Sequence, residues 1–238
     1  MLRSSGFWIQ RVLVSVFTLG AVFAFGFASL IPAVATSGPT LGRDLPASAC
    51  HGGGKAPVSE NPPPLTILAA ATGTVRSMPE FGILERAPVG DDIQSTYFRT
   101  TAQNREFRRG FAEFLIPEIP EHVVSATLVI AEGGGWVSAP RDPDRHALSY
   151  YLADLSVDVA DYDRPARILG CFDTDQNLEH ERFAFDVRHL VRAYQGGDLG
   201  FRIRLVVDPT YASMGSLGAD FQTNHQADPV RIEIVTAG

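Results

Sequence analysis

The chain is poor in cysteine, in positive charge and in long apolar runs. Its two cysteines allow one disulfide at most. Because 27 Asp and Glu outnumber 20 Lys and Arg, the chain lacks the concentrated basic surface of a nucleic-acid-binding protein. One long apolar run is too few for a multi-span membrane protein. What is present, 45% hydrophobic and 20% charged residues, fits one globular domain of ordinary size.

The single long apolar run lies at the N-terminus and has the pattern of an export signal. Arg3 and Arg11 precede an uncharged stretch over residues 12–35, which ends in Ala33-Val34-Ala35. A basic start, an apolar stretch and two small residues before a cleavage point are typical of secretory signals. We therefore expect residues 1–35 to be a signal peptide, cleaved after Ala35. An uncleaved membrane anchor is the alternative, since the run is long enough to cross a bilayer.

Residues 36–64 have the composition of a linker. They are rich in Gly, Pro, Ser and Ala, with three consecutive glycines at 52–54 and three prolines at 62–64. Such a segment buries too little apolar surface to offset the entropy of ordering it. One of the two cysteines, Cys50, lies here, and the other is Cys171. In an oxidising compartment they are candidates for a disulfide, with a buried free Cys171 as the alternative.

From residue 65 to residue 238, apolar and polar residues alternate with period two. The clearest segments are residues 124–130, 183–187, 201–207 and 230–234. Weaker ones cover residues 66–76, 93–99, 109–116, 148–157 and 166–172. Each segment predicts a strand with one buried and one wet face, and in the first, Val124, Ala126, Leu128 and Ile130 are expected to share the inner face. The pattern predicts an all-β domain, an antiparallel two-sheet β-sandwich of jelly-roll-like type.

One segment has helical spacing instead. Val187, Leu190, Val191 and Tyr194 are spaced i, i+3, i+4 and i+7, which predicts a short amphipathic helix over residues 187–195. Asp186 is placed to cap its first amides, and Gly196 or Gly197 to take the left-handed conformation after it. We expect this helix to close one end of the sandwich, with His189 on its wet face.

Several short motifs occur in an order that resembles a known family. They are Arg-Gly-Phe-Ala-Glu-Phe from Arg109, Val-Ser-Ala-Thr-Leu-Val-Ile from Val124, Phe-Asp-Val from Phe185, Leu-Gly-Phe-Arg-Ile-Arg-Leu from Leu199, and Pro-Val-Arg-Ile-Glu-Ile-Val from Pro229. This order is similar to that of the bacterial and archaeal surface modules called DNRLRE domains, which are related to carbohydrate-binding jelly rolls. The name-giving hexapeptide is absent here. The resemblance implies a non-catalytic surface module.

No established catalytic motif is present. The chain lacks G-x-S-x-G, C-x-x-C and paired-histidine metal motifs. Its sharpest polar feature is an acidic segment containing Asp158, Asp161 and Asp163, with Asp154 before them. Closely spaced carboxylates are ligands that calcium prefers, so a structural calcium ion is one hypothesis, and no cofactor is otherwise expected. The alternative is that these residues form turns and the wet face of a strand.

Three aromatic residues near predicted loops, Trp136, Tyr150 and Tyr162, are candidates for a sugar-binding platform, because aromatic faces stack on sugar rings. The alternative is that they pack within the fold. Tyr150 and Tyr151 are neighbours on a strand, so they point to opposite faces and one platform can use only one of them.

The leading functional hypothesis is an exported, non-catalytic module that binds or structures extracellular or cell-envelope material, with glycan as the favoured ligand. Two alternatives stay open. One is a structural scaffold that mediates protein contacts. The other is a carboxylate-dependent polysaccharide hydrolase or lyase, for example with Glu113 and Asp220 as an acid–base pair.

Overall fold

The computed structural model describes residues 65–101, 104–119, 122–135, 144–174, 181–206, 215–223 and 226–237. All described residues belong to one compact unit. The expected signal peptide, the expected linker, Cys50 and Trp136 lie outside the described residues.

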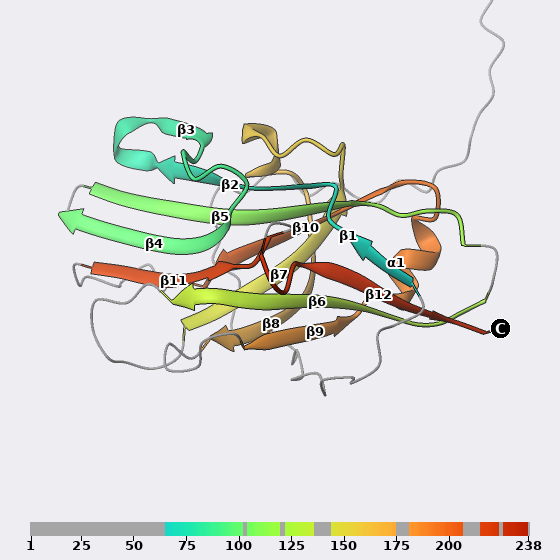
Figure 1. The fold of residues 1–238 in the computed structure, drawn as a ribbon. Helices are drawn as coiled ribbons and strands as arrows, with labels where there is room; N and C mark the ends of the chain where they lie inside the picture. The colour runs from blue at the N-terminus through green and yellow to red at the C-terminus, as the bar shows by residue number, and fades with distance from the viewer. Residues whose placement is uncertain are drawn as a thin grey trace, which may run out of the picture. The chain divides into compact units, whose positions relative to one another are not determined.

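The described residues form an all-β fold with one short α-helix (Figure 1). The strands are β1 (Leu65–Leu68), β2 (Ala71–Met78), β3 (Ile83–Arg86), β4 (Ile93–Thr101), β5 (Asn104–Leu115), β6 (Val123–Gly135), β7 (Asp144–Leu152), β8 (Arg167–Thr174), β9 (Arg182–Asp186), β10 (Asp198–Leu205), β11 (Gly215–Phe221) and β12 (Arg231–Thr236). The helix α1 covers Arg188–Ala193, and two 3₁₀ turns, η2 and η3, cover Pro79–Phe81 and Val159–Asp161.

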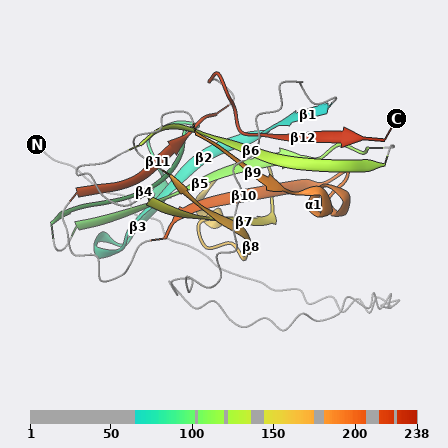
Figure 2. The same ribbon diagram turned by 90° about the horizontal axis from the view of Figure 1, so that it is seen from below.

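The strands form two layers, and every pairing among the described strands is antiparallel. One layer has the order β1-β12-β6-β9, and the other has the order β3-β2-β5-β10-β7-β8. Strands β4 and β11 join them, because β4 pairs with the first half of β5 while β11 pairs with the last residues of β6. Figures 1 and 2 show β1, β12 and β6 side by side. The predicted antiparallel sandwich is confirmed.

The main core lies between the two layers. It contains alternate residues of the facing strands, as period two requires. One layer contributes Leu128, Ile130, Phe183, Phe185, Ile232 and Ile234, and the other contributes Phe114, Leu148, Phe172, Leu199, Phe201 and Ile203. Burial of each large apolar side chain contributes about 1.5–3 kcal/mol, so these inward faces supply much of the driving force for folding. A second, smaller cluster lies on the opposite face of β2, β5 and β7 and includes Val75, Phe111, Tyr151 and Val157.

For the predicted strand over residues 124–130, the expectation that Val124 faces inward is wrong. Val124 is 47% exposed, whereas Val123 is buried. The cause is a β-bulge between β6 and β12, where Val235 pairs with Ser125 but Thr236 pairs with Val123. A bulge inserts one residue and moves the residues beyond it to the other face.

The predicted helix is present and shorter than expected, covering Arg188–Ala193. The Asp186 carboxylate accepts a hydrogen bond from the Arg188 amide at 2.9 Å, and Gly196 has a φ of +72°, as both were expected to do. Val187, Leu190 and Val191 are buried in the main core. Figures 1 and 2 place α1 at the end of the sandwich where β6 begins and β12 ends.

Two predicted strands have the wrong extent. The segment 66–76 is two strands, because β1 pairs with β12 in one layer and β2 pairs with β5 in the other. The crossing lies within Leu68-Ala69-Ala70-Ala71, which contains no Gly or Pro to mark a turn, so the sequence pattern did not show it. The segment 148–157 leaves the sheet at Leu152, and the chain then turns through Leu155, which has a φ of +60°.

Two strands, β3 and β11, were missed. Strand β11 reads GSLGADF, which lacks β-branched residues. Gly218 within it has a φ of +112°, and a Cβ there would lie 2.1 Å from the Ser95 carbonyl oxygen. The close approach of β4 therefore requires glycine at this position.

Candidate functional site

The most polar buried region lies on the outer face of the second layer, where β5, β10 and β7 are neighbours. Glu113 of β5 and Tyr151 of β7 are both paired with Gly200 of β10, one from each side. The three positions share a face because directly paired residues in antiparallel strands point the same way. The next outward residue of β10 is Arg202.

Gly200 lets Tyr151 cross the middle strand. A Cβ at position 200 would lie 2.4 Å from the Tyr151 ring, so the ring rests directly on the β10 backbone. With the ring in this position, the Tyr151 hydroxyl donates a hydrogen bond to Glu113 Oε1 at 2.7 Å. A hydrogen bond thus joins two strands that are not adjacent in the sheet.

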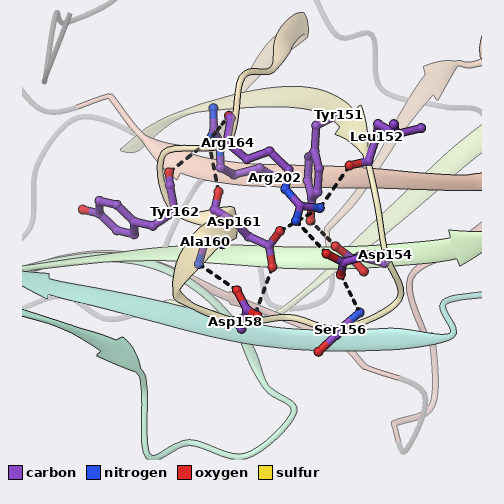
Figure 3. Close-up of polar contacts among 11 residues, drawn as sticks. Tyr151, Leu152, Asp154, Ser156, Asp158, Ala160, Asp161, Tyr162, Arg164 and Arg202 are labelled. Carbon is purple, nitrogen blue, oxygen red and sulfur yellow. Dashed lines mark hydrogen bonds and ion pairs between the residues drawn. The ribbon is translucent and has the colours of Figure 1, made fainter. Parts of the chain in front are cut away.

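Residues 153–166, which we call the strap, cover this region (Figure 3). The 3₁₀ turn η3 lies within the strap and begins with a capping box. In it, Asp158 Oδ1 accepts a hydrogen bond from the Ala160 amide at 2.7 Å, and Asp161 Oδ2 accepts one from the Asp158 amide at 2.9 Å. The two carboxylates thereby satisfy amides that the short turn leaves without partners.

Two arginines of the sheet hold the strap from below. Arg202 Nη1 donates to the carbonyl oxygens of Asp161, Tyr162 and Arg164 at 3.3, 2.9 and 3.1 Å. Arg109 donates to the Tyr162 carbonyl and to Asp163 Oδ1, and its guanidinium lies 3.8 Å from the centroid of the Tyr162 ring. A planar cation with several donors suits a segment that presents carbonyls and an aromatic face together.

A third arginine, Arg164, belongs to the strap and ties its two ends together. It donates to the Leu152 carbonyl at 3.1 Å and to Asp154 Oδ2 at 2.6 Å, and it forms an ion pair with Asp161 Oδ1 at 3.2 Å. Its guanidinium also lies 5.6 Å from the centroid of the Tyr151 ring. Figure 3 shows these contacts converging beneath the strap.

The carboxyls under the strap are shielded from water. Glu113 and Asp161 are both 0% exposed, and Glu113 Oε2 and Asp161 Oδ1 lack a hydrogen-bond partner. Burial raises the pKa of Glu113, and the charges of Asp161 and Asp154 raise it further against the opposing hydrogen bond from Tyr151. Burial likewise raises the pKa of Asp161, opposed by the Asp158 amide and by Arg164.

Tyr151 and Arg202 shift in the same sense, away from the charged form, whereas the hydrogen bond between Arg164 and Asp154 raises the pKa of Arg164 and lowers that of Asp154. Burial raises the pKa of the Tyr151 hydroxyl, and the neighbouring Glu113 adds to that shift. Burial lowers the pKa of Arg202 to about 10, and the nearby cations Arg109 and Arg204 contribute. Desolvation is the common cause, because removal of water penalises every charged form.

The residues suggested as calcium ligands are engaged elsewhere. Asp158 and Asp161 bind amides of the turn, and Asp163 pairs with Arg109 at 3.1 Å. Across the described segments, no three His, Cys, Asp or Glu side chains are arranged to hold a metal ion. A calcium ion here would have to displace the amide and guanidinium partners of these carboxylates, and calcium binding stays a prediction.

The residues suggested for a sugar platform do not share a face. Tyr150 packs against the main core and meets the exposed His189 of α1 edge to face, with ring centroids 6.4 Å apart. Tyr162 belongs to the outer cluster and is 8% exposed. Trp136 lies outside the described residues. Tyr150 and Tyr162 therefore contribute to two different surfaces.

A second buried polar group lies in the main core, and the sequence reasoning missed it. His146 of β7 is 0% exposed, with Ser95 Oγ 3.0 Å from Nδ1 and Thr174 Oγ1 3.1 Å from Nε2. Burial lowers the pKa of His146 to about 3. The His146 ring stacks on the Phe172 ring, with the two ring centroids 5.3 Å apart. Its two-residue spacing from Leu148 was the available signal that it faces inward.

The structure does not bring Glu113 and Asp220 together. Asp220 lies on β11 opposite Gln94, and β4 separates that strand from β5. The acidic residues whose charges act on Glu113 are Asp161 and Asp154. Cys171, on β8, is disulfide-bonded, and the chain's other cysteine lies outside the described residues.

Comparison with protein-family models and with curated proteins finds no relative of this chain. No family model matches the chain, and a search of curated proteins finds no significant match. Within the described part of the chain, no helix has both the length and the apolar character needed to cross a membrane.

Proposed function

We propose that this chain is an exported, non-catalytic β-sandwich module that binds or structures material outside the cytoplasm, with glycan as its ligand class. The N-terminal signal pattern supports export. The resemblance to DNRLRE surface modules supports a binding or structural role, and the confirmed sandwich is compatible with it.

One observation carries the non-catalytic part of the proposal. Among the described residues, Glu113, Asp161 and His146 are the carboxyl and imidazole groups whose pKa values burial shifts toward the neutral form, and each is 0% exposed. Each also holds parts of the fold together, since Glu113 joins β5 to β7, Asp161 caps η3, and His146 links β4 to β8. A group that does acid–base chemistry on a polymer must reach the polymer.

The outer surface of the strap supports the choice of ligand. It presents the carboxylates of Asp154 and Asp163, whose side chains are 50% and 68% exposed, beside the guanidinium groups of Arg164 and Arg109. Carboxylate and guanidinium groups side by side supply the acceptors and donors that sugar hydroxyls require.

The test is retention of the exported full-length chain on a panel of insoluble polysaccharides and on a glycan array. We expect retention on at least one polymer, weakened at least threefold by D163A. The matched control is D173A, which removes a similarly exposed carboxylate from an ion pair with Arg145 at 3.2 Å, on the edge strand β8. That variant should bind like the wild type.

Two results would redirect the proposal. Absence of retention on every polymer, together with self-association in crosslinking, would replace glycan binding with the scaffold role. Release of soluble sugars from a retained polymer would overturn the non-catalytic assignment, and loss of that release in E113Q would identify the buried carboxyl as the reacting group.

A further inference from the structure

The strap closes over a carboxyl group that has no cation of its own. Glu113 Oε1 accepts a hydrogen bond from the Tyr151 hydroxyl, whereas Oε2 has no hydrogen-bond partner among the described residues although the side chain is fully buried. The Ser156 amide of the strap also acts on this carboxyl and, like the Tyr151 hydroxyl, lowers its pKa against the larger effect of burial. The nearest strap carboxylates are Asp161 and Asp154, and both are paired with Arg164. One guanidinium thus serves two carboxylates and leaves the third uncompensated.

The other cationic side chains around Glu113 form hydrogen bonds with the strap backbone or ion pairs with other acids. Arg202 Nη1 donates to strap carbonyls, and Arg109 binds the Tyr162 carbonyl and Asp163. On the other side of β5, the β2 residue paired with Glu113 is Ala71, which has no charge. Arg86 of β3, near this end of β2, forms its ion pair with Asp91 at 2.8 Å.

We propose that the strap is a proton-sensitive latch, which is tight while Glu113 carries a proton and loosens when Glu113 ionises. A proton on Oε2 removes the buried negative charge beside Asp161. It also converts an acceptor without a partner into a donor, close to Asp161, whose Oδ1 is a buried acceptor without a hydrogen bond. Ionisation restores the repulsion between a carboxylate of the sheet and a carboxylate of the strap, with little water to screen it.

The direction of the pH effect follows from the same arrangement. Burial and the charges of Asp161 and Asp154 raise the pKa of Glu113 when the strap is closed. The closed state therefore binds a proton more tightly than the open state, in which water reaches the carboxyl. The stabilisation of the closed strap by this proton is fully present below the ordinary glutamate pKa and is lost as the pH rises through the raised pKa. Opening uncovers Tyr151 and Phe111 of the outer cluster.

Hydrogen exchange in the full-length chain tests the latch. Amide protection of residues 157–164, corrected for the intrinsic effect of pH on exchange, is compared at pH 5 and pH 8. We expect protection to be lost at the higher pH, because the proton that favours the closed strap is released there. E113Q keeps an acceptor for Tyr151 and stays neutral, so its strap should be equally protected at both values.

The matched control is E106Q, on the same strand β5, where Glu106 is half-buried and paired with Arg108 at 2.6 Å. This variant should show the wild-type fall in protection. Equal protection of the wild-type strap at pH 5 and pH 8, or an undiminished fall in E113Q, would overturn the latch.

A second measurement needs no variant. Carbon NMR titration of the Glu113 carboxyl in the wild-type chain should show a pKa raised above that of an ordinary glutamate. Titration within that range would also overturn the proposal.

Discussion

The buried histidine of the main core makes the fold sensitive to acid in a way that can be calculated. His146 has a pKa of about 3 in the folded chain, against 6.5 for an unperturbed histidine. Between these two values the unfolded chain binds a proton that the folded chain does not. The stability from this group is fully present above pH 6.5 and is lost as the pH falls toward 3.

The size of the loss follows from the shift. At pH 4.5 the unfolded histidine is about 99% protonated while the folded one is almost entirely neutral, which costs about 2.7 kcal/mol relative to neutral pH. Since the denaturant slope of a domain this size is about 2 kcal/mol per molar urea, the urea midpoint should fall by about 1 M through this group alone. Glu113 and Asp161, whose pKa values are raised, change stability in the opposite direction.

The assay is urea unfolding at pH 7.5 and pH 4.5 for the wild type and for H146F, since the difference between the two proteins cancels the carboxyl contributions. H146F keeps a ring to stack on Phe172 but removes the hydrogen bonds that the His146 ring makes with the Ser95 and Thr174 hydroxyls, so it should be less stable by about 1–3 kcal/mol at pH 7.5. Its loss of stability on acidification should be smaller than that of the wild type by about 2.7 kcal/mol.

The control is H189Q, on the exposed face of α1, which should show the wild-type dependence on pH. Equal pH dependence in H146F and the wild type would refute the reasoning. If H146F fails to fold, NMR of the His146 ring in the wild type decides the question, and a ring that protonates near pH 6.5 in the folded chain would refute it equally.

Three further outcomes are expected. G200A should lower the free energy of unfolding by about 1–3 kcal/mol in urea, because its Cβ would lie 2.4 Å from the Tyr151 ring, whereas G197A, whose nearest contact would be at 3.5 Å, should cost less. Thiol titration of the unreduced exported chain should find no free thiol, and reduction should lower stability by about 2–4 kcal/mol, because Cys171 is disulfide-bonded. Melting temperatures in calcium and in chelator should agree, because Asp158, Asp161 and Asp163 already bind protein donors, and a higher value with calcium would instead support the calcium site.

Much of the sandwich could be read from local patterns. Strands β10 and β12 are where alternation placed them, with Phe201 and Ile232 facing inward. The helix was predicted because Val187, Leu190 and Val191 change the period from two to 3.6. Prediction failed where a neighbouring strand set the geometry, as at the bulge that exposes Val124 and in β11, where Gly218 permits contact with β4.

The strap is the clearest example of a structure that the sequence pattern did not predict. The sequence showed an acidic segment, and the acids were interpreted as calcium ligands or turn formers. Arg109, which binds Asp163, and Arg202, which binds the strap carbonyls, come from the neighbouring strands β5 and β10. Nothing in the local pattern indicates that two arginines distant in the chain lie under this loop and donate hydrogen bonds to its carbonyl oxygens.

The sequence alone determined the class of fold, because away from bulges the side of a strand on which a residue lies depends on its position along that strand. The tertiary structure decided which carboxyl is buried and what it meets. Glu113, Tyr151 and Gly200 are far apart in the chain, and they come together only through the order and register of β5, β10 and β7. Strand order depends on the packing of the whole domain, and a carboxyl acquires its unusual environment only when that packing removes water from it.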